Sequence, residues 1–231
     1  MAYAEPNYYY HLDIIPNDTH FGLFWGMHNT GQNVNGTTGT DNKDIDAPEA
    51  WDITTGADRV VVAVIDSGVD GSHPDLSANL LTNSGEIPGN GLDDDGNGYV
   101  DDIRGWNFAD KDNNPADDNG HGTHVTGIIA AVGNNGIGVA GVAWNAKIMA
   151  LKSFRADGSG LTSDAIPAIA YANLMGADVI NNSWGGVNTW SHLFRVALGF
   201  GRLFDHLLFY RMVWKKKTVI KKFGQKTVKH R

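Results

Sequence analysis

Short, continuous apolar runs are the feature that most constrains the fold of this 231-residue chain. One run covers residues 60–65 (VVVAVI), another covers residues 147–151 (KIMAL), and residues 177–180 (ADVI) begin a third. Runs of this length without polar alternation are typical of parallel strands that are covered on both faces. The chain is therefore expected to contain a buried parallel sheet.

A first helix is expected over residues 125–132, between the first two runs. It is entered through the glycine-rich residues 119–122 and stopped near Gly133. The order of apolar runs and helical segments predicts an α/β fold with a doubly wound parallel sheet. Ligands of such sheets bind beyond the carboxyl ends of the strands.

A second helix is expected between the second and third runs. Residues 162–164 (TSD) form a plausible N-cap cluster, and the helical spacing continues to Met175 and stops at Gly176. Pro167 fits this helix only if it falls in the first turn, because proline lacks the amide hydrogen that later turns need.

The charge of the chain changes sign near Asn188. Residues 1–188 hold seven Lys or Arg and 25 Asp or Glu, a net charge of −18, whereas residues 189–231 hold 11 and one, a net charge of +10. Such a reversal marks a compositional boundary. Cysteine is absent, which excludes disulfides, a thiol nucleophile and a cysteine-based zinc site.

Asp66 follows the first apolar run directly, in the segment IDSGVD. A carboxylate here would lie at the carboxyl end of a buried strand, beside a glycine that lets the chain turn. The alternative is a solvated aspartate in a strand-to-loop turn.

His121 lies in the segment HGTHVTG, at the expected mouth of the first helix. A histidine there could act as a general base, with Asp66 as the carboxylate that orients it. His124 is one helical turn further on and is interpreted as structural. A zinc site at the two histidines is not favoured, because the segment lacks the HExxH pattern.

Small and glycine residues close the third apolar run in the segment NNSWGG, which includes Ser183, Trp184 and Gly185. In a peptidase, an exposed edge of this kind would pair with an extended substrate. The alternative is a simple strand-to-loop turn.

Together, the three segments resemble the motifs of the subtilisin-like serine proteases (subtilases, peptidase family S8) over roughly residues 2–188. The resemblance implies that Asp66 orients His121, that His121 moves the proton, and that Ser183, Trp184 and Gly185 bind the substrate. The order aspartate, histidine, serine is the established subtilisin order.

The resemblance also implies a serine in a Gly-Thr-Ser segment and an oxyanion-hole asparagine beyond Gly186, and neither is present in the sequence. The serines after His121 are Ser153, Ser159, Ser163, Ser183 and Ser191, and none lies in such a segment. We therefore expect the N-terminal part of a catalytic domain, incomplete on its C-terminal side and truncated before the serine motif. Alone, it would lack a nucleophile.

A loop rich in carboxylates lies between the aspartate and histidine segments, in the stretch DDDGNGYVDD. Oxygen ligands alternate there around glycines, which suits structural Ca²⁺. An EF-hand would need glutamate at the twelfth position from Asp93, where Arg104 stands. The expected ligands are Asp93, Asp95, Asn97, Asp101 and Asp102.

Two further calcium sites follow from the resemblance. The residues Asp110, Asp112 and Asn114 resemble a loop that some heat-stable subtilases carry before the histidine motif. The residues Asp18, Asp75 and Asn134 resemble the calcium site that the family shares. Calcium would make the stability of the domain depend on the ion.

The expected organisation is the end of a propeptide or a linker at residues 1–16, a partial peptidase domain at 17–188, and an unrelated basic tail at 189–231. A shifted reading frame is one interpretation of this tail. The resemblance implies secretion, a polypeptide substrate and an inhibitory propeptide, although no signal peptide opens the chain. No nucleic-acid partner and no membrane binding by the tail are expected. The alternative function is a non-catalytic fragment that binds peptides, or membranes through its cationic tail.

Overall fold

The computed structural model describes residues 14–185 and contains a four-stranded parallel sheet. Its strands are β3 (Val61–Asp66), β4 (Gly105–Asn107), β5 (Lys147–Lys152) and β6 (Val179–Asn181), in the spatial order β4-β5-β3-β6. β3 pairs with β5 from Val61 opposite Lys147 to Asp66 opposite Lys152. The expected α/β fold with a parallel sheet is confirmed.

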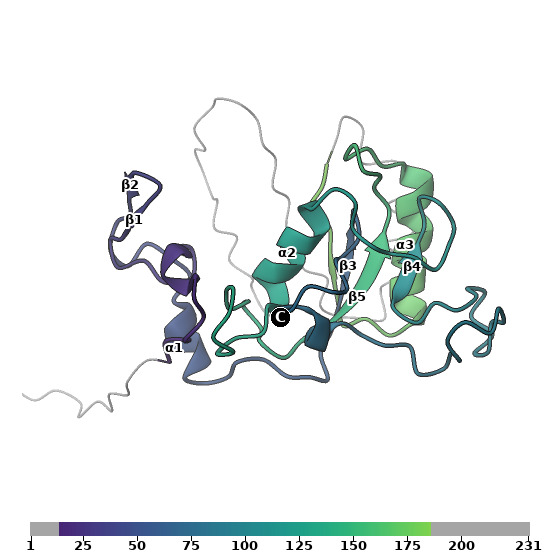
Figure 1. Ribbon diagram of the computed structural model, residues 1–231, viewed down its shortest axis with the longest axis horizontal. Helices are drawn as coiled ribbons and strands as arrows, with labels where there is room; N and C mark the ends of the chain where they lie inside the picture. The colour runs from purple at the N-terminus through teal and green to yellow at the C-terminus, as the bar shows by residue number, and fades with distance from the viewer. Residues whose placement is uncertain (1–13, 186–231) are drawn as a thin grey trace, which may run out of the picture.

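Two helices cover opposite faces of this sheet (Figure 1). Helix α2 (His121–Ala130) packs on Val62, Val64, Ile148 and Ala150. Helix α3 (Thr162–Leu174) packs on Ala63, Ile65, Met149 and Leu151. The alternation of side chains along each strand therefore supplies two separate cores.

The connections through the two helices have opposite hands. Helix α2 joins β4 to β5 and α3 joins β5 to β6, and both connections move in the same direction across the sheet. Because the two helices nevertheless lie on opposite faces, one of the connections departs from the usual right-handed rule.

The N-terminal part forms a smaller cluster beside α2 (Figure 1). It contains the 3-10 helix η1 (Phe21–Leu23), the hairpin β1 (Asn33–Val34) and β2 (Thr37–Thr38), and helix α1 (Ala47–Trp51). A second 3-10 helix, η2 (Ser77–Asn79), follows β3. The rings of Phe21, Trp51 and Trp144 pack together, with centroids 5.6 and 4.9 Å apart.

Both expected helices form, but their starts differ from the prediction. Helix α2 begins at His121 rather than Val125, because Gly120 adopts a left-handed conformation that turns the chain into the helix. Helix α3 ends before Gly176 as expected. Its N-cap is Leu161, without a side-chain cap hydrogen bond, so the expected capping role of residues 162–164 is wrong.

Pro167 lies inside α3, as its sixth residue, so the helix accommodates it outside the first turn, contrary to the condition set from the sequence. Its neighbours in the helix, Ala165, Ala168 and Ile169, are buried in the core on the sheet. This packing offsets the hydrogen bond that proline cannot donate.

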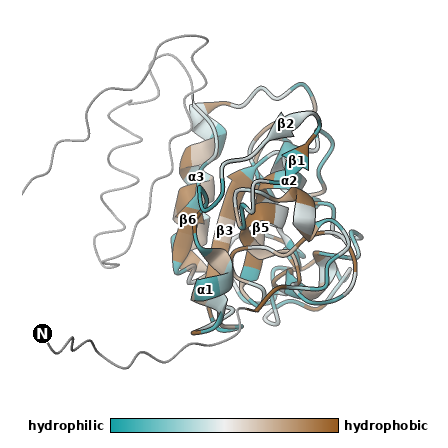
Figure 2. Ribbon diagram, turned by 90° about the vertical axis from the view of Figure 1, so that its left-hand side faces the viewer, coloured by the Kyte–Doolittle hydropathy of each residue, from teal (hydrophilic) through white to brown (hydrophobic). Residues whose placement is uncertain are grey.

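Figure 2 shows the strands of the sheet as markedly hydrophobic, with the connecting loops more hydrophilic. Among residues 14–185, no helix is long and apolar enough to cross a membrane. Most of the segment that is expected to be the end of a propeptide or a linker (1–16), and all of the expected basic tail at 189–231, lie outside the described residues.

The buried face of β5 provides a test of this fold. Replacing Leu151, which is fully buried, with alanine removes core contacts and should lower the free energy of unfolding by about 2–5 kcal/mol. The matched control is Leu174→Ala, because Leu174 is 61% exposed at the end of α3. Urea denaturation of both variants measures the difference, and equal losses would contradict the core assignment.

Candidate active site

Asp66 is the last residue of β3 and is almost fully buried. Its Oδ1 accepts a hydrogen bond from the Ser67 amide at 2.7 Å. Its Oδ2 is buried and has no hydrogen-bond partner among the described residues. The chain therefore places a carboxylate at the carboxyl end of a central strand, which is the expected position for a functional group in this fold.

His121 is the first residue of α2, and its side chain is half exposed. The glycines on either side allow this position. Gly120 has a φ of 96°, and a Cβ on Gly122 would collide with the carbonyl oxygen of Gly68 and approach Asp66. The glycines in the histidine segment thus let α2 approach the turn that follows β3.

The two side chains meet: the Nδ1 of His121 lies 2.7 Å from the Oδ1 of Asp66. An ionised carboxylate can only accept, so Nδ1 carries the hydrogen and Nε2 keeps its lone pair when the ring is neutral. An imidazole held in this tautomer is equipped to take a proton at Nε2 and to return it.

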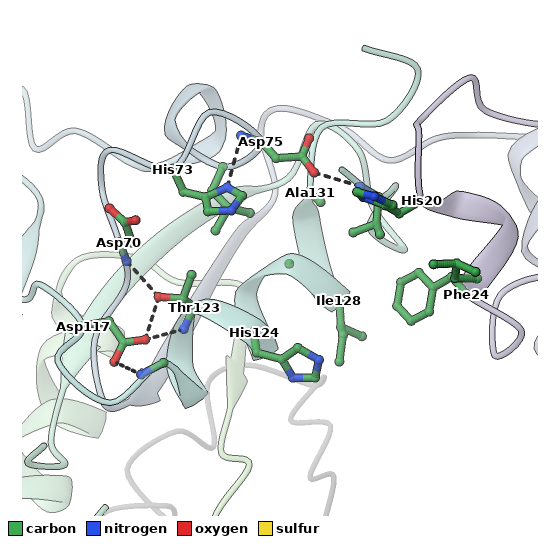
Figure 3. Close-up of a pocket in the computed structure, with 15 residues that line it drawn as sticks. His20, Phe24, Asp70, His73, Asp75, Asp117, Thr123, His124, Ile128 and Ala131 are labelled. Carbon is green, nitrogen blue, oxygen red and sulfur yellow. Dashed lines mark hydrogen bonds between the residues drawn. The ribbon is translucent and has the colours of Figure 1, made fainter. Parts of the chain in front are cut away.

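Asp117 organises the start of α2, although it stands in none of the motifs that select the other candidate residues. Its Oδ1 accepts hydrogen bonds from the Ser67 hydroxyl and from the amides of Asn119 and Gly120, at 2.8, 3.0 and 2.9 Å. Its Oδ2 accepts from the amide and hydroxyl of Thr123, at 2.8 and 2.6 Å (Figure 3). Burial opposes ionisation of this carboxyl, but the hydrogen bonds outweigh it and lower its pKa to about 2.

Lys152 is a second side chain that the sequence analysis missed. It is the last residue of β5 and is buried, which is rare for a lysine. Its Nζ donates to the carbonyl oxygens of Ser67 and Phe154, at 2.8 and 2.9 Å, and to the carboxylate of Asp118. This ammonium therefore holds the turn after Asp66 to the end of β5.

The expected substrate-binding residues follow β6. The Ser183 hydroxyl accepts a hydrogen bond from the side-chain amide (Nδ2) of Asn181 at 3.0 Å. The indole of Trp184 donates to the carbonyl oxygen of Ile65 at 2.7 Å, and its ring lies 5.3 Å from that of Phe154. The segment that contains Ser183, Trp184 and Gly185 therefore follows the carboxyl end of β6, on the same side of the sheet as Asp66 at the carboxyl end of β3.

The acidic loop brings together a carboxylate set that differs in part from the expected one. Oxygens of Glu86, Asp95 and Asp102 lie within 4.8 Å of one another. Asp95 and Asp102 were selected from the sequence, whereas Glu86 was not. Amide groups of Asn83 and Asn97 bridge the carboxylates of Asp95 and Asp102.

Other expected ligands of this loop accept hydrogen bonds from the loop itself. Asp93 accepts from the amides of Asn97 and Gly98. Asp101 accepts from the amides of residues 89–91. The Asn97 Oδ1 accepts from the amide of Tyr99. These side chains shape the loop in the structure.

One hydrogen bond joins the acidic loop to the core. The Tyr171 hydroxyl, on α3, donates to the Oδ2 of Asp102 at 2.6 Å, and both residues are buried. Burial and the neighbouring Asp102 carboxylate raise the pKa of Tyr171 well above its usual value.

The second expected loop forms a compact turn. Asp110 accepts from the side-chain amide of Asn107 at 3.1 Å, and Asp112 accepts from the backbone amide of Asn114 at 3.0 Å. The side-chain oxygen of Asn114 accepts from Ala116. All three side chains are thus near one another in the chain and engaged in local turns.

The third expected set lies where the N-terminal part meets the loop after α2. Asp18 accepts from the amide of Asn134 through Oδ2 at 2.7 Å, while its buried Oδ1 lacks a partner among the described residues. The buried Asp75 accepts from the Asn135 side chain and from the Val139 amide. An orphaned, buried carboxylate oxygen is a group that a cation would satisfy.

A cavity of about 660 Å³ runs along α2, from Gly120 before its start to Ala131 after its end. Figure 3 shows His124 and Ile128 from α2 on one side and His20 and Phe24 from the N-terminal part on the other. His124, interpreted as structural from the sequence, thus lines this cavity and does not share the contact of His121 with Asp66.

Comparisons with known proteins place these observations in context. Residues 57–208 match the model of the Subtilase family (Peptidase_S8), which is more than half of the chain and extends beyond residue 188. The "Thermophilic serine proteinase" of Bacillus sp. (strain AK1) is 39% identical over 186 residues, 80% of this chain and 37% of that protein. "Thermitase" of Thermoactinomyces vulgaris is 40% identical over 142 residues, 62% of this chain and 43% of that protein.

A solved structure is also similar. The chain matches one described as proteases from Pseudoalteromonas arctica PAMC 21717, with a TM-score of 0.62 and 29% identity, over 85% of this chain and 58% of that one. The chain spans less than half of the length of the two curated relatives named above.

Protonation of Asp117 at low pH should lower the free energy of unfolding. The pKa of Asp117 in the folded protein is about 2, below its ordinary value of 3.8. Its ionised form therefore stabilises the fold above pH 4, and this contribution is lost as the pH falls through about 2. Allowing for solvent screening at this partly exposed group, Asp117→Asn should cost about 1 kcal/mol at pH 5. Urea denaturation of both proteins from pH 5 to 2 should show the difference shrinking, and a constant difference would contradict the assignment.

Proposed function

Because the chain belongs to the subtilase family, we propose that its chemistry is that of a serine-type endopeptidase, with Asp66 orienting His121 and His121 as the general base. The observation that carries the proposal is the 2.7 Å contact between His121 Nδ1 and Asp66 Oδ1 at the carboxyl edge of the sheet. In this reaction, His121 Nε2 would take the proton of a serine hydroxyl as its oxygen attacks the peptide carbonyl, and would then give it to the leaving amine.

The polypeptide substrate would bind beside Ser183, Trp184 and Gly185. The position of Trp184 supports this proposal. Its indole NH donates a hydrogen bond to the carbonyl oxygen of Ile65, the residue before Asp66. Substrate backbone held along this segment would lie close to His121. An inhibitory propeptide, part of the same proposal, would use the same edge.

We also propose that this chain alone does not hydrolyse peptide bonds. The sequence contains no Gly-Thr-Ser segment. Ser153 is fully buried, Ser67 donates to Asp117, and Ser183 is paired with Asn181. Among the described residues, no serine hydroxyl is hydrogen-bonded to His121. The domain limits 17–188 and the unrelated tail at 189–231 belong to this proposal, although the family match itself continues to residue 208.

Calcium is proposed as a structural ion at the acidic loops. The Glu86, Asp95 and Asp102 cluster supplies oxygens at short separation, and repulsion among these carboxylates would favour a cation. At Asp18 and Asp75, the partnerless oxygen of Asp18 supports a second site, which Asn134 would complete. Asp110, Asp112 and Asn114 remain a third proposed site. Calcium sites of modest affinity suit an extracellular location, which the resemblance implies.

The catalytic pair can be tested without a serine by using an activated ester that histidine can hydrolyse. The full chain should hydrolyse p-nitrophenyl acetate faster than the His121→Ala variant by at least about tenfold, because general-base catalysis is lost. Asp66→Asn should also slow the reaction, because the ring loses its ionised partner. The matched control is His124→Ala, on the same helix. Equal rates for the two histidine variants would refute the assignment.

Peptide cleavage by the chain should be undetectable in the same samples. Casein or a chromogenic peptide should stay intact, and a fluorophosphonate probe should label no serine, because no hydroxyl is activated. Labelling at any serine would overturn the proposal that the chain lacks a nucleophile.

Calcium should raise the thermal stability of the chain. At a free concentration of about 100 times Kd, each site would add about 2.7 kcal/mol, and chelation should lower Tm by several degrees. Asp95→Asn should reduce this calcium-dependent shift, because it removes a ligand of the Glu86 cluster. The control is the exposed Asp58→Asn, which removes the same charge elsewhere. Calorimetry that finds no calcium-dependent shift in the unsubstituted chain would refute the ion proposal.

A further inference from the structure

We propose that Asp117 is a positioning residue for His121: its carboxylate ties the first turn of α2 to the turn after Asp66 and so fixes the contact between His121 and Asp66. The effect of Asp117 on catalysis rests on the proposed function. The positioning of His121 against Asp66 does not rest on it, because it concerns only how these two side chains are held together.

The Asp117 carboxylate has an unusually complete set of donors. Two backbone amides and a hydroxyl bond to one oxygen, and an amide and a hydroxyl bond to the other. Because five donors share the roughly four lone-pair sites of the two oxygens, the carboxylate has little freedom to rotate. It can therefore act as a rigid centre for the segments that supply the donors.

Two of these segments are the ones that carry the candidate catalytic pair. The Ser67 hydroxyl donates to Asp117 and accepts from the amide of Gly122 at 2.9 Å, which joins the residue after Asp66 to the residue after His121. The Thr123 hydroxyl donates to Asp117 and accepts from the amide of Asp70 at 2.9 Å (Figure 3). The network thus joins α2 to both ends of residues 67–70.

The start of α2 needs such support because its own N-cap provides none. Gly120 is the N-cap and has no side chain, so the first amides of the helix need acceptors from elsewhere. Ser67 and Asp117 accept those of Gly122 and Thr123. Asp117 therefore replaces the missing cap from a position outside the helix.

His121 depends on this placement more than most side chains would. Its ring is half exposed, and its contact with Asp66 spans 2.7 Å. A movement of α2 by about 1 Å would take the two atoms beyond hydrogen-bond distance. Fixing the helix start against residues 67–70 is therefore a direct way of keeping the pair formed.

The test measures the pair itself, in the full chain with calcium. The hydrogen shared between His121 Nδ1 and Asp66 gives a low-field proton resonance in NMR spectra, which the His121→Gln variant identifies by its disappearance. In Asp117→Ala, exchange of this hydrogen with solvent should become roughly tenfold faster, because the paired state is less populated. Ser67→Ala, which removes only the bridge to Gly122, should act in the same direction.

Asp44→Ala is the matched control for a purely structural effect. Asp44 also accepts hydrogen bonds from backbone amides, but both of these, Asn29 and Asp46, belong to the N-terminal part and neither to α2. It should lower stability and leave the His121 resonance unchanged. Asp117→Asn, which keeps one acceptor oxygen, should give an intermediate exchange rate if the alanine variant does not fold.

Different results would contradict the positioning role of Asp117 and the proposed catalytic function. Wild-type exchange rates in folded Asp117 and Ser67 variants would overturn the proposal, and so would an equal effect of Asp44→Ala. Absence of the resonance in the unsubstituted chain would also overturn it. A failure of the ester hydrolysis alone would instead count against the proposed function, because the resonance reports the pair whether or not the pair is catalytic.

Discussion

The parallel pairing of β3 with β5 is the constraint on which the rest of the structure depends. Alternate residues of β3 face different helices: Val62 and Val64 pack with α2, and Ala63 and Ile65 pack with α3. A shift of one residue would exchange the two faces, so burial on both sides fixes the register. The register in turn places Asp66 at the carboxyl end of β3, directly opposite Lys152 at the carboxyl end of β5. The helix that carries His121 packs on the same strands.

Much of this fold could be predicted from the sequence, because burial on both faces of a strand leaves a visible pattern. The apolar runs at residues 60–65 and 147–151 match β3 and β5 to within one residue. β4 escaped prediction because three residues (Gly105–Asn107) carry no periodicity. The start of α3 was misjudged because Thr162–Asp164 have capping chemistry, whereas packing of the helix decided where it begins. The opposite hands of the two connections have no local signal at all.

The candidate site, like the fold, could be predicted only in part from the sequence. Asp66 and His121 stand in recognisable segments, and the structure brings them together. Asp117, Lys152 and Glu86 lie in no such segment, and their importance depends on partners distant in the sequence: Ser67 for Asp117 and Lys152, and Asp95 and Asp102 for Glu86. A lysine at the end of an apolar run was the one available signal, because a buried ammonium needs several acceptors. Composition alone cannot show which carboxylates face one another and which bind their own loop.

The hydrogen bond between Tyr171 and Asp102 has a consequence for the order in which the chain acquires its structure. The two residues are separated by 69 positions, and contacts of such separation form only after a large loss of chain entropy. The loop that ends in Asp102 cannot make this bond until α3 has docked on the sheet. The acidic loop therefore completes its contact with the core only in a molecule whose α3 is already in place.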